Sequence, residues 1–312
     1  MLIAPILLSV QFRLASSFMP KANANGIEIE YETFGDPGAT PLLLVRGLST
    51  QLIHWDPEFC KALVERDLFV VIFDNRDVGR STWFDDAGLP DMDALFSGAP
   101  VELAYGIDDM ADDTVGLLDA LSLESVHLAG ISMGGMIVQA AAIRHPGRVR
   151  SMTSVMSSSG APELPPPTPE AMASLLSPAP TERAAYIEST VEGQKIIGSP
   201  GFPFDARREA ERAGRAYDRA FHPDGVARQL AAVRSHGDRR PGLAGLQMPA
   251  LVIHGTDDPL IPLDHGKDTA SSIPGAELHI FEGMGHDIPT ALHRDIVAVL
   301  AEFAHRADGG DR

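Results

Sequence analysis

Short apolar runs alternate along the chain with segments in which apolar residues recur at helical spacing. Residues 42–45 and 69–73 are continuous apolar runs with the length of a buried strand, and residues 27–34 alternate like a half-buried strand. Helical spacing is found over residues 57–66 and 109–121. Short apolar strands separated by helices are typical of a parallel sheet covered on both faces, so the pattern predicts an α/β fold. Further strands are expected at 126–129, 149–155, 251–254 and 277–281, and further helices at 133–144, 264–272 and 289–305.

One long segment interrupts this alternation. It opens with the serines 157–159 and a Pro-rich run over 162–169, and it continues with charged helical sequence at 207–219. No run within residues 158–245 has the character of a buried strand, and the strand pattern resumes after Pro249. We therefore expect a helical cap over residues 158–245, inserted between two strands of the core. The remaining division is an N-terminal tail at 1–26, a core in two parts at 27–157 and 246–305, and a C-terminal tail at 306–312.

The charge balance of the chain is strongly acidic. Its 312 residues include 43 Asp and Glu against 25 Lys and Arg, which gives a net charge of −18. Such a surface repels phosphate backbones and anionic lipid, so nucleic acids and membrane surfaces are poor partners. It suits a substrate that is neutral or positively charged. The single cysteine, Cys60, allows no intrachain disulfide and lies in a stretch with the pattern of a helix core.

The N-terminal segment bears on the expected location. Residues 1–19 are apolar but too short to span a bilayer, and the positive charge that precedes the apolar run of a secretory signal is absent, since Arg13 follows it. We expect a cytoplasmic protein, with export through the apolar N-terminus as the alternative. No other run reaches about 18 apolar residues, so no transmembrane helix is expected.

The sharpest motif is Gly130-Ile131-Ser132-Met133-Gly134-Gly135, which follows an apolar strand and opens a helix. This is the context of a nucleophile elbow, in which the chain turns sharply and projects the serine hydroxyl at the end of the sheet. The residues two before and two after the serine must be small, and both are glycine here. The N–H of Met133, at the helix N-terminus, is placed to receive a developing oxyanion. A phosphate-binding turn is the alternative, but neither common phosphate-binding pattern matches. The motif predicts that Ser132 is a nucleophile.

A serine nucleophile needs a histidine base, and eleven histidines compete for that role. His127, His145 and His254 lie in or at the ends of predicted strands and helices, so we expect them to be structural. His286 differs, because it lies in a glycine-rich loop directly after the last predicted strand. Glycines there allow the side chain to reach over the sheet edge, so His286 is the expected base.

The base needs an acid to orient it, and two adjacent carboxylates qualify. Asp257 and Asp258 both follow the predicted strand 251–254. Either one gives the chain order of serine, acid and histidine, which is one of the orders in which such triads occur.

These motifs resemble those of the α/β-hydrolase fold family, and the resemblance covers about residues 26–303. The family's G-x-x-D-x-x-x-P pattern, which here ends at Pro262, implies that Asp258 is the acid and leaves Asp257 as the alternative. The family's G-x-G-H pattern implies that His286 is the base.

The same resemblance implies the details of the fold. It implies a mostly parallel sheet of about eight strands with helices on both faces, and a helical cap inserted after the sixth strand. Residues 74–81 are similar to the family's D-x-R-G-x-G-x-S loop, which is structural in the family, with Asp77 in place of a glycine. Four stretches look most like the branch of aclacinomycin methylesterases and related bacterial carboxylesterases: 46–55, 73–81, 131–136 and 283–289.

The resemblance also implies a second oxyanion donor in the loop after residues 42–45. Family members often carry His-Gly-x there, and the x residue gives its main-chain N–H; this chain has Arg46-Gly47-Leu48. Leu48 and Met133 are therefore the expected oxyanion hole, and loss of the histidine does not remove a main-chain donor. We expect Arg46 to form a structural ion pair, with binding of an acidic group near the site as the alternative.

The implied mechanism is two-step acyl transfer, in which Ser132, His286 and Asp258 cleave a small-molecule carboxylic ester through an acyl-enzyme. No metal or organic cofactor is expected, because the chain has no H-E-x-x-H motif and no cysteine pair. The sequence does not identify the residues that bind the substrate. The protein is expected to be a monomer or a homodimer. One alternative is C–C bond hydrolysis, lactone hydrolysis or cofactor-free perhydrolysis on the same triad, and another is a non-catalytic ligand-binding protein.

Overall fold

The computed structural model describes residues 19–309, so the apolar residues 1–18 and the last residues 310–312 lie outside the described part. The strands of the described chain are β1 (Lys21–Ala24), β2 (Ile27–Phe34), β3 (Thr40–Val45), β4 (Leu68–Phe73), β5 (Val126–Ile131), β6 (Val149–Val155), β7 (Ala250–Gly255) and β8 (Glu277–Phe281). Its α-helices are α1 (Pro57–Val64), α2 (Met92–Ser97), α3 (Ile107–Ala120), α4 (Met133–Arg144), α5 (Pro169–Leu176), α6 (Arg183–Ile197), α7 (Ala206–Arg219), α8 (Pro223–Ser235), α9 (Arg240–Leu243), α10 (Leu263–Ser271) and α11 (His293–Ala307).

The strands form one sheet in the order β1-β2-β4-β3-β5-β6-β7-β8. The pairs β1–β2 and β2–β4 are antiparallel, and the remaining pairs are parallel. Every residue of β4, β5 and β7 is buried, because helices cover both faces of the sheet, and this explains the continuous apolar runs of the sequence. The predicted α/β-hydrolase architecture with a mostly parallel sheet of about eight strands is confirmed.

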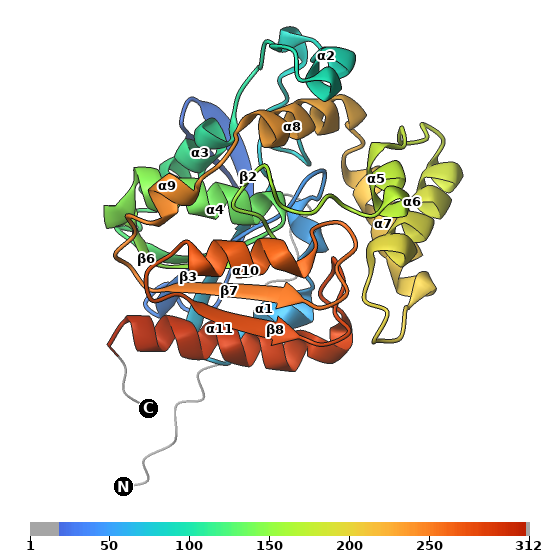
Figure 1. Ribbon diagram of the computed structural model, residues 1–312. Coiled ribbons are helices and arrows are strands. Elements are labelled where there is room, and N and C mark those ends of the chain that lie inside the picture. Colours follow the sequence, from blue (N-terminus) through green and yellow to red (C-terminus); the bar gives the residue numbers. More distant parts are fainter. Residues whose placement is uncertain (1–18, 310–312) are drawn as a thin grey trace, which may run out of the picture.

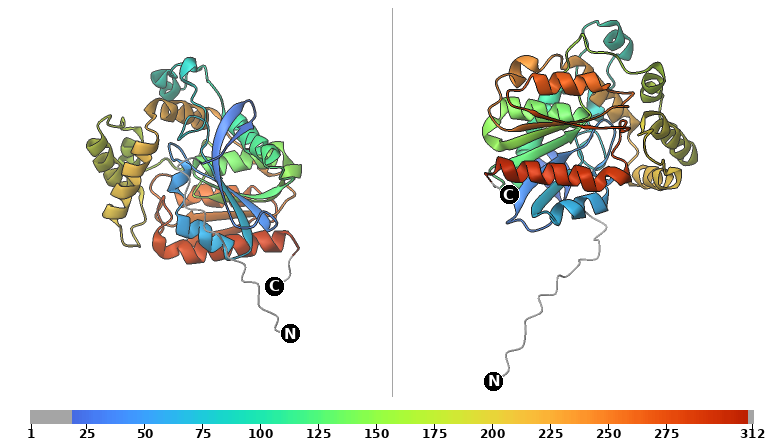
Figure 2. Two further views of the ribbon diagram at one scale, coloured as in Figure 1. Left: turned by 180° about the vertical axis from the view of Figure 1, so that it is seen from behind. Right: turned by 60° about the horizontal axis from the view of Figure 1, so that its bottom comes forward.

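Two helical layers enclose the sheet (Figure 1, Figure 2). On one face α1 and α11 pack together, with Phe59 and Leu300 in a buried apolar cluster. On the other face α3 and α4 pack together, with Leu117 and Ile137 in a second cluster. The core thus consists of two apolar layers separated by the sheet, and the carboxyl ends of the parallel strands meet along one edge.

The predicted N-terminal tail at 1–26 is wrong for residues 21–24, which form β1 and pair with β2. The turn between the two strands is Asn25-Gly26, with φ angles of +49° and +81°. Asn-Gly is a strong signal for a two-residue hairpin, because both positions need positive φ. At the other end, α11 runs to Ala307, two residues past the predicted core boundary at 305.

The segment predicted as a cap contains α5 to α9 and divides into two parts (Figure 1). Helix α6 packs against both α5 and α7, and these three helices stand outside the two layers around the sheet. Helices α8 and α9 return to the core, where Ala232 and Leu243 join the same buried cluster as α4. Arg228 on α8 forms a buried ion pair with Asp77, with nitrogen–oxygen distances of 2.8 and 2.9 Å. The aspartate that replaces the family's glycine therefore anchors this second part.

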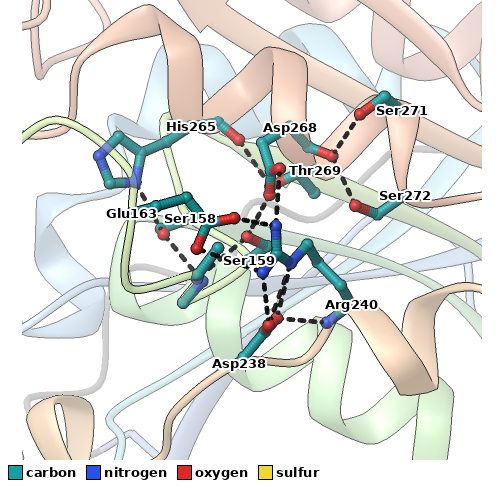
Figure 3. Close-up of polar contacts among 12 residues, drawn as sticks. Ser158, Ser159, Glu163, Asp238, Arg240, His265, Asp268, Thr269, Ser271 and Ser272 are labelled. Atoms are coloured by element: carbon teal, nitrogen blue, oxygen red, sulfur yellow. Dashed lines mark hydrogen bonds and ion pairs between the residues drawn. The ribbon is translucent and has the colours of Figure 1, made fainter.

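A polar cluster ties both ends of the 158–245 segment to α10 (Figure 3). Ser159 Oγ donates to Asp268 on α10, and Ser158 Oγ lies 2.8 Å from Nδ1 of His265 on the same helix. Near the other end of the segment, Arg240 pairs with Asp268 on α10 at 3.6 Å, and it also pairs with Asp238 at 2.7 Å and with Glu163. These contacts fix the two points at which the chain leaves and re-enters the core.

Candidate active site

The turn between β5 and α4 holds Ser132 in a strained conformation, with φ +57° and ψ −121°. A Cβ atom on Gly130 would lie 2.1 Å from the carbonyl oxygen of Gly134, and one on Gly134 would lie 2.3 Å from the carbonyl oxygen of Val45. Only glycine fits at either position, which is the steric reason for the Gly-x-Ser-x-Gly spacing. The Ser132 N–H donates to the Val155 carbonyl at 2.9 Å, and this contact joins the turn to the neighbouring strand.

The loops after β7 and β8 bring Asp258 and His286 together. His286 Nδ1 lies 2.7 Å from Oδ2 of Asp258, and both side chains are buried. The other carboxylate oxygen of Asp258 accepts the N–H groups of Leu260 and Ile261 at 2.9 and 2.8 Å. Hydrogen bonds to both oxygens fix the orientation of the carboxylate. Asp257 is exposed and its carboxylate contacts the Thr256 hydroxyl, so the geometry favours Asp258 as the partner of the histidine.

A cavity of about 640 Å³ opens between the core and α5–α8, and Ser132 and His286 both line it. Among residues 19–309 no hydrogen bond joins the Ser132 hydroxyl to the imidazole. Such contacts commonly form only when substrate binds, so the shared cavity is compatible with a nucleophile and its base.

Two main-chain N–H groups lie beside Ser132. Leu48 and Met133 line the same cavity, and no hydrogen bond from either N–H to another protein group is found within residues 19–309. A Cβ atom on Gly47 would lie 3.1 Å from Cβ of Ser132, so the loop after β3 approaches the nucleophile closely. Both N–H groups are therefore available as donors to a group bound beside Ser132, and the oxyanion hole of Leu48 and Met133 stays a prediction.

Arg46 contacts an aromatic ring instead of the carboxylate expected from the sequence. The predicted structural ion pair is wrong, because Arg46 contacts no carboxylate within residues 19–309. Its guanidinium lies over the ring of Trp55, 4.8 Å from the centroid, and it lines the cavity.

The α6–α7 connection holds the histidine loop, and sequence reasoning missed this contact. The N–H of His286 donates to the Ile197 carbonyl at 2.7 Å, and the N–H of Gly285 donates to Ser199 Oγ at 2.9 Å. The N–H of Gly201 donates to the Gly283 carbonyl at 2.9 Å. The glycines on both sides are the only trace of this contact in the sequence, since they permit close approach of two main chains.

Other polar side chains have structural partners. His127 lies 2.8 Å from the Ser151 hydroxyl, and His145 lies 2.6 Å from Asp112. His254 contacts the Ile261 carbonyl at 2.7 Å. These three histidines hold the fold, as their positions in the sequence predicted.

No competing chemistry stands out in the described part of the chain. Burial raises the pKa of the Cys60 thiol to about 12, so this cysteine is a poor nucleophile. Residues 19–309 contain no group of three His, Cys, Asp or Glu side chains placed to hold a metal ion. No helix of residues 19–309 has the length and apolar character needed to cross a membrane.

The fold is that of an α/β hydrolase. The α/β hydrolase fold family matches residues 40–289, and the chain belongs to this family. It is similar to the rhodomycin D methylesterase of Streptomyces sp. (strain C5), at 30% identity over 302 residues, which cover 88% of this chain and 94% of that protein.

The chain is also similar to a second curated protein and to a solved structure. The 2-hydroxy-6-oxononadienedioate/2-hydroxy-6-oxononatrienedioate hydrolase 1 of Dechloromonas aromatica (strain RCB) is 34% identical over 177 residues, which cover 55% of this chain and 59% of that protein. Among solved structures, the enol-lactonase from Burkholderia xenovorans LB400 has a TM-score of 0.68 at 25% identity, covering 91% of this chain and 99% of that one. The expected resemblance to the methylesterase branch is confirmed.

Proposed function

We propose that this protein cleaves a carboxylic ester, and a methyl ester in particular, through an acyl-enzyme on Ser132. The observation that carries the proposal is the hydrogen bond between Asp258 and His286, at the cavity that Ser132 also lines. The likeness to a rhodomycin D methylesterase over nearly the whole chain supports a methyl ester as the substrate, with methanol as the leaving group.

In the proposed mechanism, His286 takes the proton of the Ser132 hydroxyl as the oxygen attacks the ester carbonyl. Asp258 holds the imidazole tautomer and stabilises the imidazolium that forms. The N–H groups of Leu48 and Met133 stabilise the tetrahedral oxyanion, and each such donor is worth about 2.7–4 kcal/mol in other enzymes. His286 returns its proton to the leaving alcohol, and a water activated by the same histidine then hydrolyses the acyl-enzyme.

C–C bond hydrolysis is the second candidate, because the relative from Dechloromonas aromatica is named for such a dienedioate substrate and aligns over 177 residues. Lactone hydrolysis follows the same chemistry on a cyclic ester. Both reactions would use the same three side chains, so only substrate tests separate them.

A substrate panel and a covalent probe test the proposal. We expect hydrolysis of methyl and p-nitrophenyl esters and little turnover of a vinylogous diketone; the reverse preference would support C–C bond hydrolysis. A fluorophosphonate should label Ser132, and Ser132→Ala should abolish both labelling and turnover. Ser189→Ala is the matched control, because this exposed serine on α6 lines the same cavity. Absence of a Ser132 adduct would favour a ligand-binding protein.

The proposal includes a cytoplasmic enzyme, monomeric or homodimeric, that acts without cofactor or nucleic acid. Cell fractionation and light scattering of the purified full chain measure the first two properties directly.

A further inference from the structure

Four arginines line the cavity, and they differ in their partners. Arg208 pairs with Asp56, and Arg212 pairs with Glu209. Arg234 is exposed to solvent and lies over the ring of Phe96. Arg46 is the one cavity arginine of the described chain that is neither exposed nor in contact with a carboxylate.

Arg46 has few contacts for its five N–H donors. Nε lies 3.4 Å from the Thr50 hydroxyl, which is long for a hydrogen bond, and no other protein acceptor of the guanidinium is found within residues 19–309. The ring of Trp55 gives the guanidinium a cation–π contact. This contact does not replace hydrogen-bond acceptors for the N–H groups of Arg46. The outer edge of the guanidinium is therefore left to whatever enters the cavity.

A second unused donor lies beside the first. Trp55 is 4% exposed and also lines the cavity, and its indole Nε1–H is buried with no hydrogen-bond partner among the described residues. Buried donors of this kind are rare in native proteins and each calls for an explanation, and an acceptor bound in the cavity would supply one here. Arg46 and Trp55 thus present a cation and a neutral donor without an acceptor.

The surroundings of Arg46 weaken its charge but do not remove it. Burial, with Arg212 nearby, lowers the pKa of Arg46 to about 9, so the guanidinium is still a cation at neutral pH. Burial, Arg212 and Arg46 hold the pKa of His54 well below its usual value, so that imidazole stays neutral beside it. An anion in the cavity would relieve both the missing hydrogen bonds and the unpaired charge.

We propose that Arg46 and Trp55 form an anion-binding subsite for a carboxylate of the substrate, so that the enzyme favours monoesters of dicarboxylic acids. This inference rests on the proposed function, since the ester carbonyl of the same molecule is placed at Ser132. A planar carboxylate matches the two parallel N–H groups of a guanidinium, which favours this anion. The net charge of −18 does not oppose it, because surface charges are screened beyond about 10 Å while a cavity contact is not.

The test is a ratio of two substrates of matched chain length. Monomethyl adipate carries a free carboxylate, and methyl hexanoate is its neutral counterpart. We expect wild type to prefer the anionic ester, and Arg46→Gln to lower the ratio of the two kcat/KM values by roughly 10- to 100-fold, the range for a charged hydrogen-bond pair. Arg46→Lys should restore part of the ratio. Arg234→Gln, which removes the exposed cavity arginine, should keep the wild-type ratio.

The outcomes separate this proposal from the proposed function. If wild type hydrolyses both esters without preference, or if Arg46→Gln lowers both equally, the subsite is wrong and the esterase stands. If neither ester is hydrolysed, binding of monomethyl adipate to Ser132→Ala, measured by calorimetry, decides the matter without chemistry. Binding that is lost in Ser132→Ala/Arg46→Gln supports the subsite, and equal binding to both variants overturns it.

Discussion

The main-chain N–H of His286 donates a 2.7 Å hydrogen bond to the carbonyl of Ile197, the last residue of α6. Ser199 adds two contacts two residues further on, since its hydroxyl accepts from the Gly285 N–H and donates to the Asp287 carboxylate. The loop that carries the proposed base is therefore fixed from the cap side as well as from the sheet. A shift of this connection would move the imidazole relative to Ser132.

Replacing Ser199 by Ala tests this coupling. We expect kcat to fall by about 10- to 100-fold, because a displacement of about 1 Å in a catalytic group can cost that much. Labelling of Ser132 by a fluorophosphonate should slow in parallel, while the thermal unfolding midpoint stays near that of wild type. Ser199→Thr keeps a hydroxyl and should recover activity. Ser189→Ala is the control on the same cap, and a Ser199→Ala enzyme as active as this control would contradict the coupling.

The choice between two adjacent carboxylates gives the next prediction. Asp258→Asn should lower kcat by about 10⁴-fold, because an amide stabilises the wrong imidazole tautomer. Asp257→Asn should leave kcat close to wild type, because that carboxylate contacts only Thr256 among the described side chains. Steady-state kinetics on one methyl ester measure both variants. A larger loss at Asp257 would move the acid to that residue.

The sheet could be predicted where burial on both faces leaves continuous apolar runs, as in β4 and β5. β1 could not be predicted from apolar pattern, because its sequence is Lys-Ala-Asn-Ala and only one of its residues is buried. The signal that could have found it is the Asn25-Gly26 turn, whose positive φ angles suit a hairpin. Helix α2 was missed for a similar reason, because only Leu95 of its residues is buried.

In the site, too, features set by neighbouring residues could be predicted from the sequence, and features set by contacts between distant residues could not. Ser132 and His286 are marked by short motifs, because the steric demands of a tight turn act over a few residues. The unpaired state of Arg46 was not predictable, since it depends on where α7 places its own acidic and basic side chains. The hydrogen bond from the His286 N–H to the Ile197 carbonyl joins main-chain groups that are 89 positions apart in the sequence. A contact between main chains leaves no pattern of side chains from which it could be predicted.

Strain at the nucleophile predicts an effect on stability. A residue held at positive φ costs about 1–3 kcal/mol, and glycine escapes that cost while losing about 0.5–1 kcal/mol more chain entropy on folding. Ser132→Gly should therefore be more stable than Ser132→Ala by about 1 kcal/mol, although both variants lose roughly 10⁴–10⁶ in kcat. Urea unfolding compares the two. Equal stability would mean that Ser132 is not strained in solution.

Asp287 predicts a stability difference that depends on pH. Burial raises the pKa of this carboxyl above its ordinary value of 3.8, although Ser199, Arg212 and His286 act in the other direction. A group with a raised folded pKa contributes its full stability below the unfolded pKa and loses it as pH rises through the folded pKa. Asp287→Asn does not titrate, so its stability relative to wild type should increase from pH 4 upward and then level off.

The control for this pH series is Asp218, a carboxyl whose pKa shifts in the opposite direction on folding. Hydrogen bonding to Arg183 lowers the pKa of Asp218, so its contribution is present above pH 3.8 and is lost as pH falls through the folded pKa. Asp218→Asn should therefore be less stable than wild type at neutral pH, with a difference that shrinks as the pH falls. Urea unfolding at steps from about pH 2.5 to pH 8 gives both curves, with the change for Asp218→Asn below pH 3.8 and that for Asp287→Asn above it. A constant difference between Asp287→Asn and wild type would show that burial does not govern this carboxyl, and that its contacts with Ser199 and Arg212 balance the cost of burying its charge.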